Sequence, residues 1–116
     1  MIAAGRLRER LTILRHSLAS SGSLGTPQDV WTAEDTSIAC ERTDVSDGEK
    51  ALSGGLISTL RCRFVVRAWS RTASVTQKDR VRHGGVTFEV GGIKRVLSGS
   101  GGLEGYEWTC EARVDA

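Results

Sequence analysis

The sequence of 116 residues contains few side chains that could act as catalytic groups. Nucleophilic catalysis needs a serine or cysteine beside a base, and the only imidazoles are His16 and His83. His83 directly precedes two glycines, so we expect it in a solvated turn. His16 is expected on the surface, where the first strand ends. We therefore predict no catalytic residues and a protein that is not an enzyme.

Two other stretches could hold an ion or a phosphate group. Asp44, Asp47 and Glu49 carry carboxylates, but they lack the Asp-x-Asp-x-Asp-Gly loop and distal glutamate of a calcium site. The glycine-rich run "SGSGGLEG", residues 98–105, is followed by a β-type pattern. A phosphate-binding loop needs a helix N-terminus at that point. We predict no metal and no cofactor.

The three cysteines, Cys40, Cys62 and Cys110, form an odd set without a Cys-x-x-Cys pair. Neither a disulfide framework nor a zinc site is indicated by this spacing. Each cysteine lies among apolar or small residues in a strand-like run. We expect buried, reduced thiols.

The run "LRCRFVVR", residues 60–67, alternates as a half-buried strand does. Its apolar face would hold Leu60, Cys62, Phe64 and Val66, and its outer face Arg61, Arg63 and Arg67. Such arginines can contact phosphates through charge alone. The alternative is pairing across strands with Glu107 and Glu111, and exposed pairs of this kind contribute only about 0 to 1 kcal/mol each.

Aromatic residues are too few to support base recognition. A module that binds single-stranded nucleic acid usually exposes rings on which bases stack. The chain has three Trp, one Tyr and two Phe residues, and Phe64, Phe88 and Trp108 fall on predicted apolar faces. Any DNA contact is therefore expected to involve the phosphate backbone only.

The second half of the chain reads as antiparallel β-structure. Gly84 and Gly85 separate two alternating runs and predict a tight hairpin. Gly91 and Gly92 are expected to turn the chain into "IKRVL". The run "YEWTCEARV" predicts a last strand with one buried face, and residues 98–105 predict a long hairpin tip before it.

The first half is less regular. In "AAGRLRERLTILR", Leu7, Leu11 and Leu14 have helical spacing, whereas Leu11 and Ile13 alternate as in a strand. We expect "SLASSGSLGTPQD" to be a polar loop and "TSIACER" a short strand. The connection "TDVSDGEKALSGGLIST" is long enough to be a protruding loop, and "DGEKAL" within it could form one helical turn after Asp47.

Together these features predict one domain, residues 1–116, of all-β class with minor α content. The fold would be a small antiparallel β-barrel or sandwich of about six strands with a long central loop. The apolar runs are far shorter than the about 20 residues that cross a bilayer, so we expect a soluble protein.

Charge is segregated along the chain although the net charge is only +2. Residues 21–60 hold seven acidic side chains against two basic ones, and residues 61–82 hold seven basic against one acidic. Alternating blocks suit a protein that contacts copies of itself or other charged neighbours. Neutralisation between adjacent strands is the alternative.

Several segments in order resemble the tailed-phage head-tail joining family, which includes head-closure, stopper and adaptor proteins. They are "GRLRERLTILR" at residues 5–15, Trp31, Ala39, Gly48 with Glu49, the arginine strand at residues 63–67, and the hairpin at residues 80–93 with "FEVGGI". The similarity spans nearly the whole chain. It leaves open whether the subtype is stopper or adaptor, and whether the particle is a phage or a gene-transfer particle.

The resemblance implies that the first segment is a strand, with Leu7 and Leu14 packed at its ends. It also implies a structural role. A homo-oligomeric ring, expected to be a dodecamer, would close the DNA-filled head between the portal or adaptor protein and the tail terminator or tail tube protein. The expected location is the virion neck, after assembly in the host cytoplasm, with no membrane contact. Double-stranded DNA would pass through the ring with non-specific contacts.

Two sets of residues are expected to make these contacts. The channel or plug loop comprises Ser46, Asp47, Gly48, Glu49, Lys50, Leu56 and Ile57, and the basic interface or DNA-facing set comprises Arg6, Arg8, Arg10, Arg61, Arg63 and Arg67. The alternative function is a small β-barrel module that binds single-stranded nucleic acid.

Overall fold

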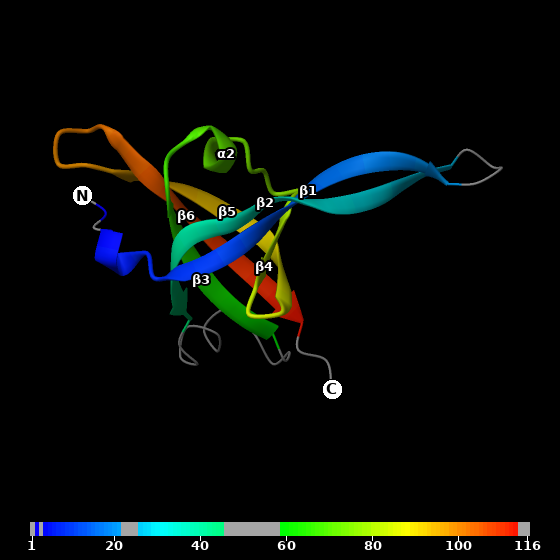
Figure 1. Cartoon of the computed structure of the whole chain (residues 1–116), viewed down its shortest axis with the longest axis horizontal. Coiled ribbons are helices and arrows are strands. Elements are labelled where there is room, and N and C mark those ends of the chain that lie inside the picture. Colours follow the sequence, from blue (N-terminus) through cyan, green and yellow to red (C-terminus); the bar gives the residue numbers. More distant parts are fainter. Residues whose placement is uncertain (1, 3, 22–25, 46–58, 114–116) are drawn as a thin grey trace.

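The computed structural model describes residues 2, 4–21, 26–45 and 59–113. Its elements are η1 (Ala4–Arg6), β1 (Glu9–Ser21), β2 (Thr26–Asp44), β3 (Thr59–Arg67), α2 (Ser70–Ala73), β4 (Arg80–His83), β5 (Val86–Leu97) and β6 (Leu103–Arg113). The strands close into one antiparallel barrel in the order β1-β2-β3-β6-β5-β4 (Figure 1). The predicted all-β class and the barrel of about six strands are confirmed.

The core lies inside the barrel and follows the predicted alternation. Phe64 on β3 is opposite Trp108 on β6, and both side chains are fully buried. The ring of Phe88 on β5 meets the Phe64 ring edge-on, with centroids 5.5 Å apart. Burying a side chain of this size contributes roughly 1.5 to 3 kcal/mol. These large residues therefore pack β3, β5 and β6 against one another inside the barrel.

The three cysteines are free and buried, as predicted. Cys62 and Cys110 are opposite each other on β3 and β6. Burial raises the pKa of Cys40 and Cys110 to about 12 and that of Cys62 to about 11. The thiols are thus small apolar core groups rather than nucleophiles.

The opening segment is a strand, not a helix. Leu11 and Ile13 on β1 enter the core, and β1 pairs with both β2 and β4. Leu7 and Leu14 are both buried. Leu7 precedes β1, as the family resemblance implied, whereas Leu14 lies in the middle of β1 rather than at its end. Leu7 packs in a second, smaller cluster with Ile2 and Val65. The residues before β1 therefore pack against a surface to which β3 contributes.

The predicted polar loop at residues 17–29 is wrong where the structure describes it. β1 continues to Ser21, and β2 begins at Thr26 and includes the predicted short strand. The outer parts of β1 and β2 form a two-stranded arm that leaves the barrel (Figure 1). Both faces of this ribbon meet solvent, so its residues do not alternate between apolar and polar. The alternation by which a strand is predicted from sequence is therefore absent there.

The two glycine pairs, Gly84 with Gly85 and Gly91 with Gly92, have different structural roles. Gly84 and Gly85 have φ angles of 59° and 79° and form the predicted β4–β5 hairpin turn. The turn predicted at Gly91 and Gly92 is wrong, because both residues lie within β5 at a shift in its pairing with β6. A Cβ on Gly91 would lie 3.3 Å from the Thr109 carbonyl oxygen, so a glycine suits this bulge. The hairpin tip predicted at residues 98–105 is confirmed for residues 98–102, and residues 103–105 belong to β6.

A short helix occurs where none was predicted, in the connection from β3 to β4. The Thr72 hydroxyl donates to the Arg67 carbonyl and accepts from the Trp69 amide, which fixes the first turn of α2. The helical turn predicted after Asp47 falls at residues 47–52, outside the described residues. No helix in the described part of the chain is long and apolar enough to span a membrane.

A close approach between β6 and β3 at Gly105 gives a first prediction. A Cβ at Gly105 would lie 2.1 Å from the Val66 carbonyl oxygen and 2.7 Å from Ile2 Cδ1. Gly105→Ala should lower the free energy of unfolding by about 2 kcal/mol or more, as overpacking against backbone does. In urea unfolding, Gly99→Ala is the matched control, since no atom lies within 4 Å of its added Cβ. Equal stability of the two variants would contradict this packing.

The raised thiol pKa values give a second prediction. Below about pH 8 the thiols are protonated in both states and contribute no pH dependence. As the pH rises further, the unfolded chain releases protons that the folded chain retains, so the free energy of unfolding should fall until about pH 11 to 12. Urea unfolding at pH 7 to 10.5 measures this slope. Cys110→Ala should reduce the slope, and an unchanged slope would contradict the assignment.

Candidate assembly interface

A network of charged side chains holds the root of the β1–β2 arm. Arg15 on β1 donates from Nη2 to Asp35 Oδ2 on β2 at 2.9 Å and to the Arg71 carbonyl of α2 at 2.6 Å. Its Nη1 lies 3.7 Å from Asp79 Oδ2, and the Arg71 Nε lies 3.3 Å from Asp35 Oδ1. The side chains of Arg15, Asp35 and Asp79 are 16%, 11% and 8% exposed. This arm-root network therefore joins four segments through nearly buried charges.

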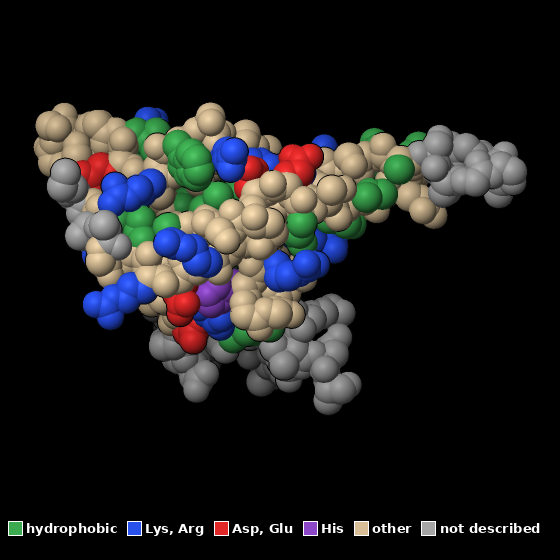
Figure 2. Space-filling model, in the orientation of Figure 1, with side chains coloured by type: hydrophobic (Ala, Val, Ile, Leu, Met, Phe, Trp, Pro, Cys, Tyr) green, Lys and Arg blue, Asp and Glu red, His purple; other side chains and the backbone are tan. Residues whose placement is uncertain are grey.

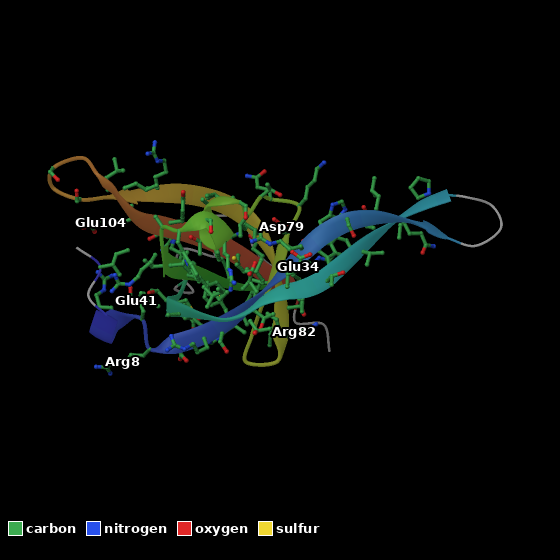
Figure 3. The ribbon with its side chains drawn as sticks, turned by 45° about the horizontal axis from the view of Figure 1, so that its top comes forward. Arg8, Glu34, Glu41, Asp79, Arg82 and Glu104 are labelled. Carbon is green, nitrogen blue, oxygen red and sulfur yellow. The ribbon has the colours of Figure 1, made fainter. Side chains whose placement is uncertain are left out.

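Asp79 is also bound by backbone groups. The His16 amide donates to its Oδ1 and the Thr76 amide to its Oδ2, both at 2.9 Å. A carboxylate this deeply buried needs such donors to offset lost hydration. Figure 3 shows Asp79 and Glu34 at the point where the arm leaves the barrel. The direction of the arm is thus fixed by the β3–β4 connection.

Trp31 and His16 form one face of an open hollow beside the arm. The Trp31 indole Nε1 donates to the Lys78 carbonyl at 2.8 Å, and the Arg80 guanidinium lies 3.5 Å from the ring centroid. His16 Nε2 lies 2.7 Å from Asp29 Oδ1. The hollow, of about 530 Å³, is lined by side chains of both charges. Among the described residues no serine or cysteine lines the hollow, so neither nucleophile lies beside His16 there.

The two histidines are less exposed than the sequence suggested. The His16 side chain is 17% exposed and lies mid-strand in β1. The His83 side chain is 10% exposed, because the end of β4 places its ring against Phe64. Its Nδ1 lies 3.0 Å from Arg42 Nη1. The predicted solvated turn histidine is therefore wrong, and both rings have structural partners.

The predicted basic residues of the N-terminal segment lie on η1, on β1 and between these two elements. Arg6 makes a two-pronged hydrogen bond to Glu41 on β2, with distances of 2.9 and 2.8 Å. This bond lowers the pKa of the Glu41 carboxyl below its usual value. Arg8 donates to the Gly5 carbonyl, and Arg10 is exposed on β1. Figure 3 shows Arg8 and Glu41 at the η1 side of the barrel.

The predicted basic residues of β3 lie on a face that carries acidic residues too. Arg61 is opposite Glu111 and donates from Nε to its Oε1 at 2.8 Å, which confirms one predicted cross-strand pair. Arg67 donates to the Ile2 carbonyl at 3.2 Å, and Arg63 is half-buried opposite Thr109. The positive charges of Arg6 and Arg61 are therefore already paired with Glu41 and Glu111 within the subunit. Contact of these residues with DNA or a neighbour stays a prediction.

The predicted plug-loop residues, Ser46, Asp47, Gly48, Glu49, Lys50, Leu56 and Ile57, lie outside the described residues. The chain before these residues is hydrogen-bonded to the chain after them: the Val45 amide donates to the Arg61 carbonyl at 3.0 Å. In Figure 1 this end of the barrel also carries the β4–β5 turn and the end of β6. The long connection thus leaves and re-enters the fold at one end of the barrel.

Exposed apolar side chains gather on two protrusions. Leu18 and Val30 on the arm are 66% and 37% exposed, and Leu97 and Leu103 on the β5–β6 hairpin are 52% and 38% exposed. The arm and this hairpin point in opposite directions (Figure 1). Figure 2 shows hydrophobic side chains along the arm and beside α2, where Trp69 is 47% exposed. The sequence did not predict that these apolar side chains lie on two protrusions, because residues 17–29 of the arm were predicted to be a loop.

The arm-root network gives a third prediction. Arg15→Met should lower the free energy of unfolding by about 3 kcal/mol, because it removes a main cationic partner of two nearly buried carboxylates. It should also speed hydrogen exchange of the arm amides. Arg8→Met is the control, since Arg8 bonds only a backbone carbonyl in an exposed position, and its change should stay within about 0.5 kcal/mol. Similar exchange rates in both variants would refute the role of Arg15.

Comparison with known proteins links this fold to a family. A family model described as phage head completion protein matches residues 2–113. No curated protein sequence matches the chain. The solution structure of protein SF1141 from Shigella flexneri 2a has a TM-score of 0.63 at 20% identity, covering 99% of this chain and 100% of that one. A chain from the virion of a native gene transfer agent particle has a TM-score of 0.66 at 23% identity, covering 96% and 98%. These two likenesses establish a shared fold.

Proposed function

The chain belongs to the phage head completion protein family, and from this premise we propose that it is a structural subunit of the particle neck, where it closes the DNA-filled head and joins the tail. The observation that carries the proposal is the extent of the family match. Residues 2–113 include all six strands of the barrel, the arm and the β5–β6 hairpin. The proposed role is one of assembly rather than catalysis.

We propose that copies of the chain form a closed ring, expected to be twelvefold. A ring needs contacts in which one surface of a subunit meets a different surface of the next. The arm and the β5–β6 hairpin are two such different surfaces, and they point in opposite directions (Figure 1). The portal or adaptor protein would contact one side of the ring and the tail terminator or tail tube protein the other.

The connection at residues 46–58 is proposed to line or plug the channel. The described chain on its two sides is joined by the hydrogen bond from the Val45 amide to the Arg61 carbonyl, at one end of the barrel. Double-stranded DNA would pass with contacts to its phosphates only, for which the exposed Arg8 and Arg10 are suited. The alternative function, binding of single-stranded nucleic acid, has less support: Phe64, Phe88 and Trp108 are fully buried, and among the described large aromatic side chains Trp69 is the exposed one.

Electron microscopy of purified particles tests the proposal directly. The expected result is ring-shaped density for this protein at the neck, and its loss, together with empty heads that lack tails, when the gene is deleted. Restoring the gene should restore full, tailed particles. Particles that assemble and infect normally without the protein would overturn the proposal.

Deletion of residues 48–55 gives a fourth prediction. The shortened protein should fold, since its barrel ladders are untouched, but heads should lose their DNA or fail to join tails. Circular dichroism and packaged DNA per particle measure the two effects. A glycine-serine replacement of the same length is the control for loop length. Full, infectious particles from the deletion variant would exclude the plug role.

A further inference from the structure

Several strands of the described barrel have edges without a partner strand, among them β2 and β5. β2 pairs with β1 along the arm, but its other edge pairs with β3 only at residues 40–44. β5 pairs with β6 up to Leu97, but its other edge pairs with β4 only at residues 86–89. Residues 28–35 of β2, the arm edge, and residues 92–97 of β5, the hairpin edge, therefore have no partner strand on that side among the described residues.

An open edge presents backbone N–H and C=O groups in a row that another strand can pair with. Natural proteins blunt such edges with charge, proline or short length. Pro27 stands at the outer end of the arm edge and removes one donor there. Within the two edges themselves proline is absent, so the protection rests on charge.

The two edges carry opposite charge. The arm edge holds Asp29, Glu34 and Asp35 and no basic residue. Asp35 is nearly buried in the arm-root network, whereas the side chains of Asp29 and Glu34 are 60% and 59% exposed although they lie near His16 and Arg15. The hairpin edge holds Lys94 and Arg95, both exposed, and no acidic residue. Like edges therefore repel each other, whereas unlike edges attract. The outer edge of β1 is open after Leu14. Arg15 and the His16 amide already bind Asp35 and Asp79 there, and residues 17–21 have no charged residue, so this edge lacks the complementarity.

Both edges also carry apolar side chains that a partner strand would cover. Val30 on the arm edge is 37% exposed, and Ile93 and Leu97 on the hairpin edge are 39% and 52% exposed. Burying these side chains adds about 25 cal/mol for each Å² of apolar surface removed from water. Apolar contact and opposite charge thus favour the same pairing.

We propose that the arm edge of one copy of this chain pairs with the hairpin edge of a second copy, so that the β-sheet continues from subunit to subunit. This inference rests on the proposed ring, and it identifies the contact that builds it. The contact is head-to-tail, because each copy offers one edge of each kind at opposite sides (Figure 1). The arm-root network holds the arm at a fixed angle, and this angle sets the rotation between neighbours.

Charge reversal tests the pairing. Lys94→Glu with Arg95→Glu should reduce incorporation of the protein into particles at least tenfold, and so should Asp29→Lys with Glu34→Lys. The chain with all four changes should recover incorporation to within about threefold, because both edges are reversed together. Lys78→Glu with Arg82→Glu is the matched control for two reversed charges, because both residues are exposed and lie outside the two edges and the proposed DNA contact. Failure of the fourfold variant, when it folds as judged by circular dichroism, would overturn the proposal.

Cross-linking gives an independent measurement. Thr32→Cys on the arm edge and Lys94→Cys on the hairpin edge should link by a flexible bismaleimide into a ladder of covalent multimers in purified particles. The native thiols are buried with raised pKa values and should not react. Thr32→Cys with Thr87→Cys is the control, because Thr87 lies where β5 is paired with β4. This control should remain monomeric.

The outcomes separate the pairing from the function. Protein present at the neck without a multimer ladder overturns the edge pairing and leaves the structural role in place. Protein absent from the particles overturns the role, and with it the pairing. A ladder of equal strength from the control variant overturns the pairing as well, since it would place other surfaces in contact.

Discussion

The structure depends on a short contact that closes the barrel. β1 and β4 pair over only three residues each, Thr12–Leu14 with Arg80–Arg82. This closure seals the core around Trp108 and Phe64. It also decides what stays outside, since β1, β2, β5 and β6 are much longer than the four residues of β4. A small closed barrel built from long strands must let the excess project, and the arm and the β5–β6 hairpin are that excess.

A two-stranded ribbon alone in water is marginally stable, so the arm needs support at its root. Arg15, Asp35 and Asp79 supply it, and the backbone amides of His16 and Thr76 complete the hydrogen bonding of Asp79. Nearly buried charges contribute little net stability but fix geometry when every group has a partner. Such a network suits a subunit whose arm has to contact a neighbouring subunit at a fixed angle.

Period-two patterning predicted the strands from Leu60 onward, because each has one dry face and one wet face. The Arg61–Glu111 pair was predictable from the same alternation. The arm was not predictable in this way, since both its faces meet solvent and its composition of polar residues is typical of a loop. Gly91 and Gly92 suit a bulge as well as a turn, and sequence alone does not separate these. The arm-root network joins residues from positions 15 to 79, which only the closed barrel brings together.

The cysteines give the barrel a chemical property suited to a particle that leaves its host. Outside the cell the surroundings are oxidising, and exposed thiols there form disulfides or sulfenic acids. Cys40, Cys62 and Cys110 are sealed among apolar side chains and keep their protons. Buried thiols that keep their protons are poor nucleophiles, so the interior packing itself protects these three side chains from oxidation.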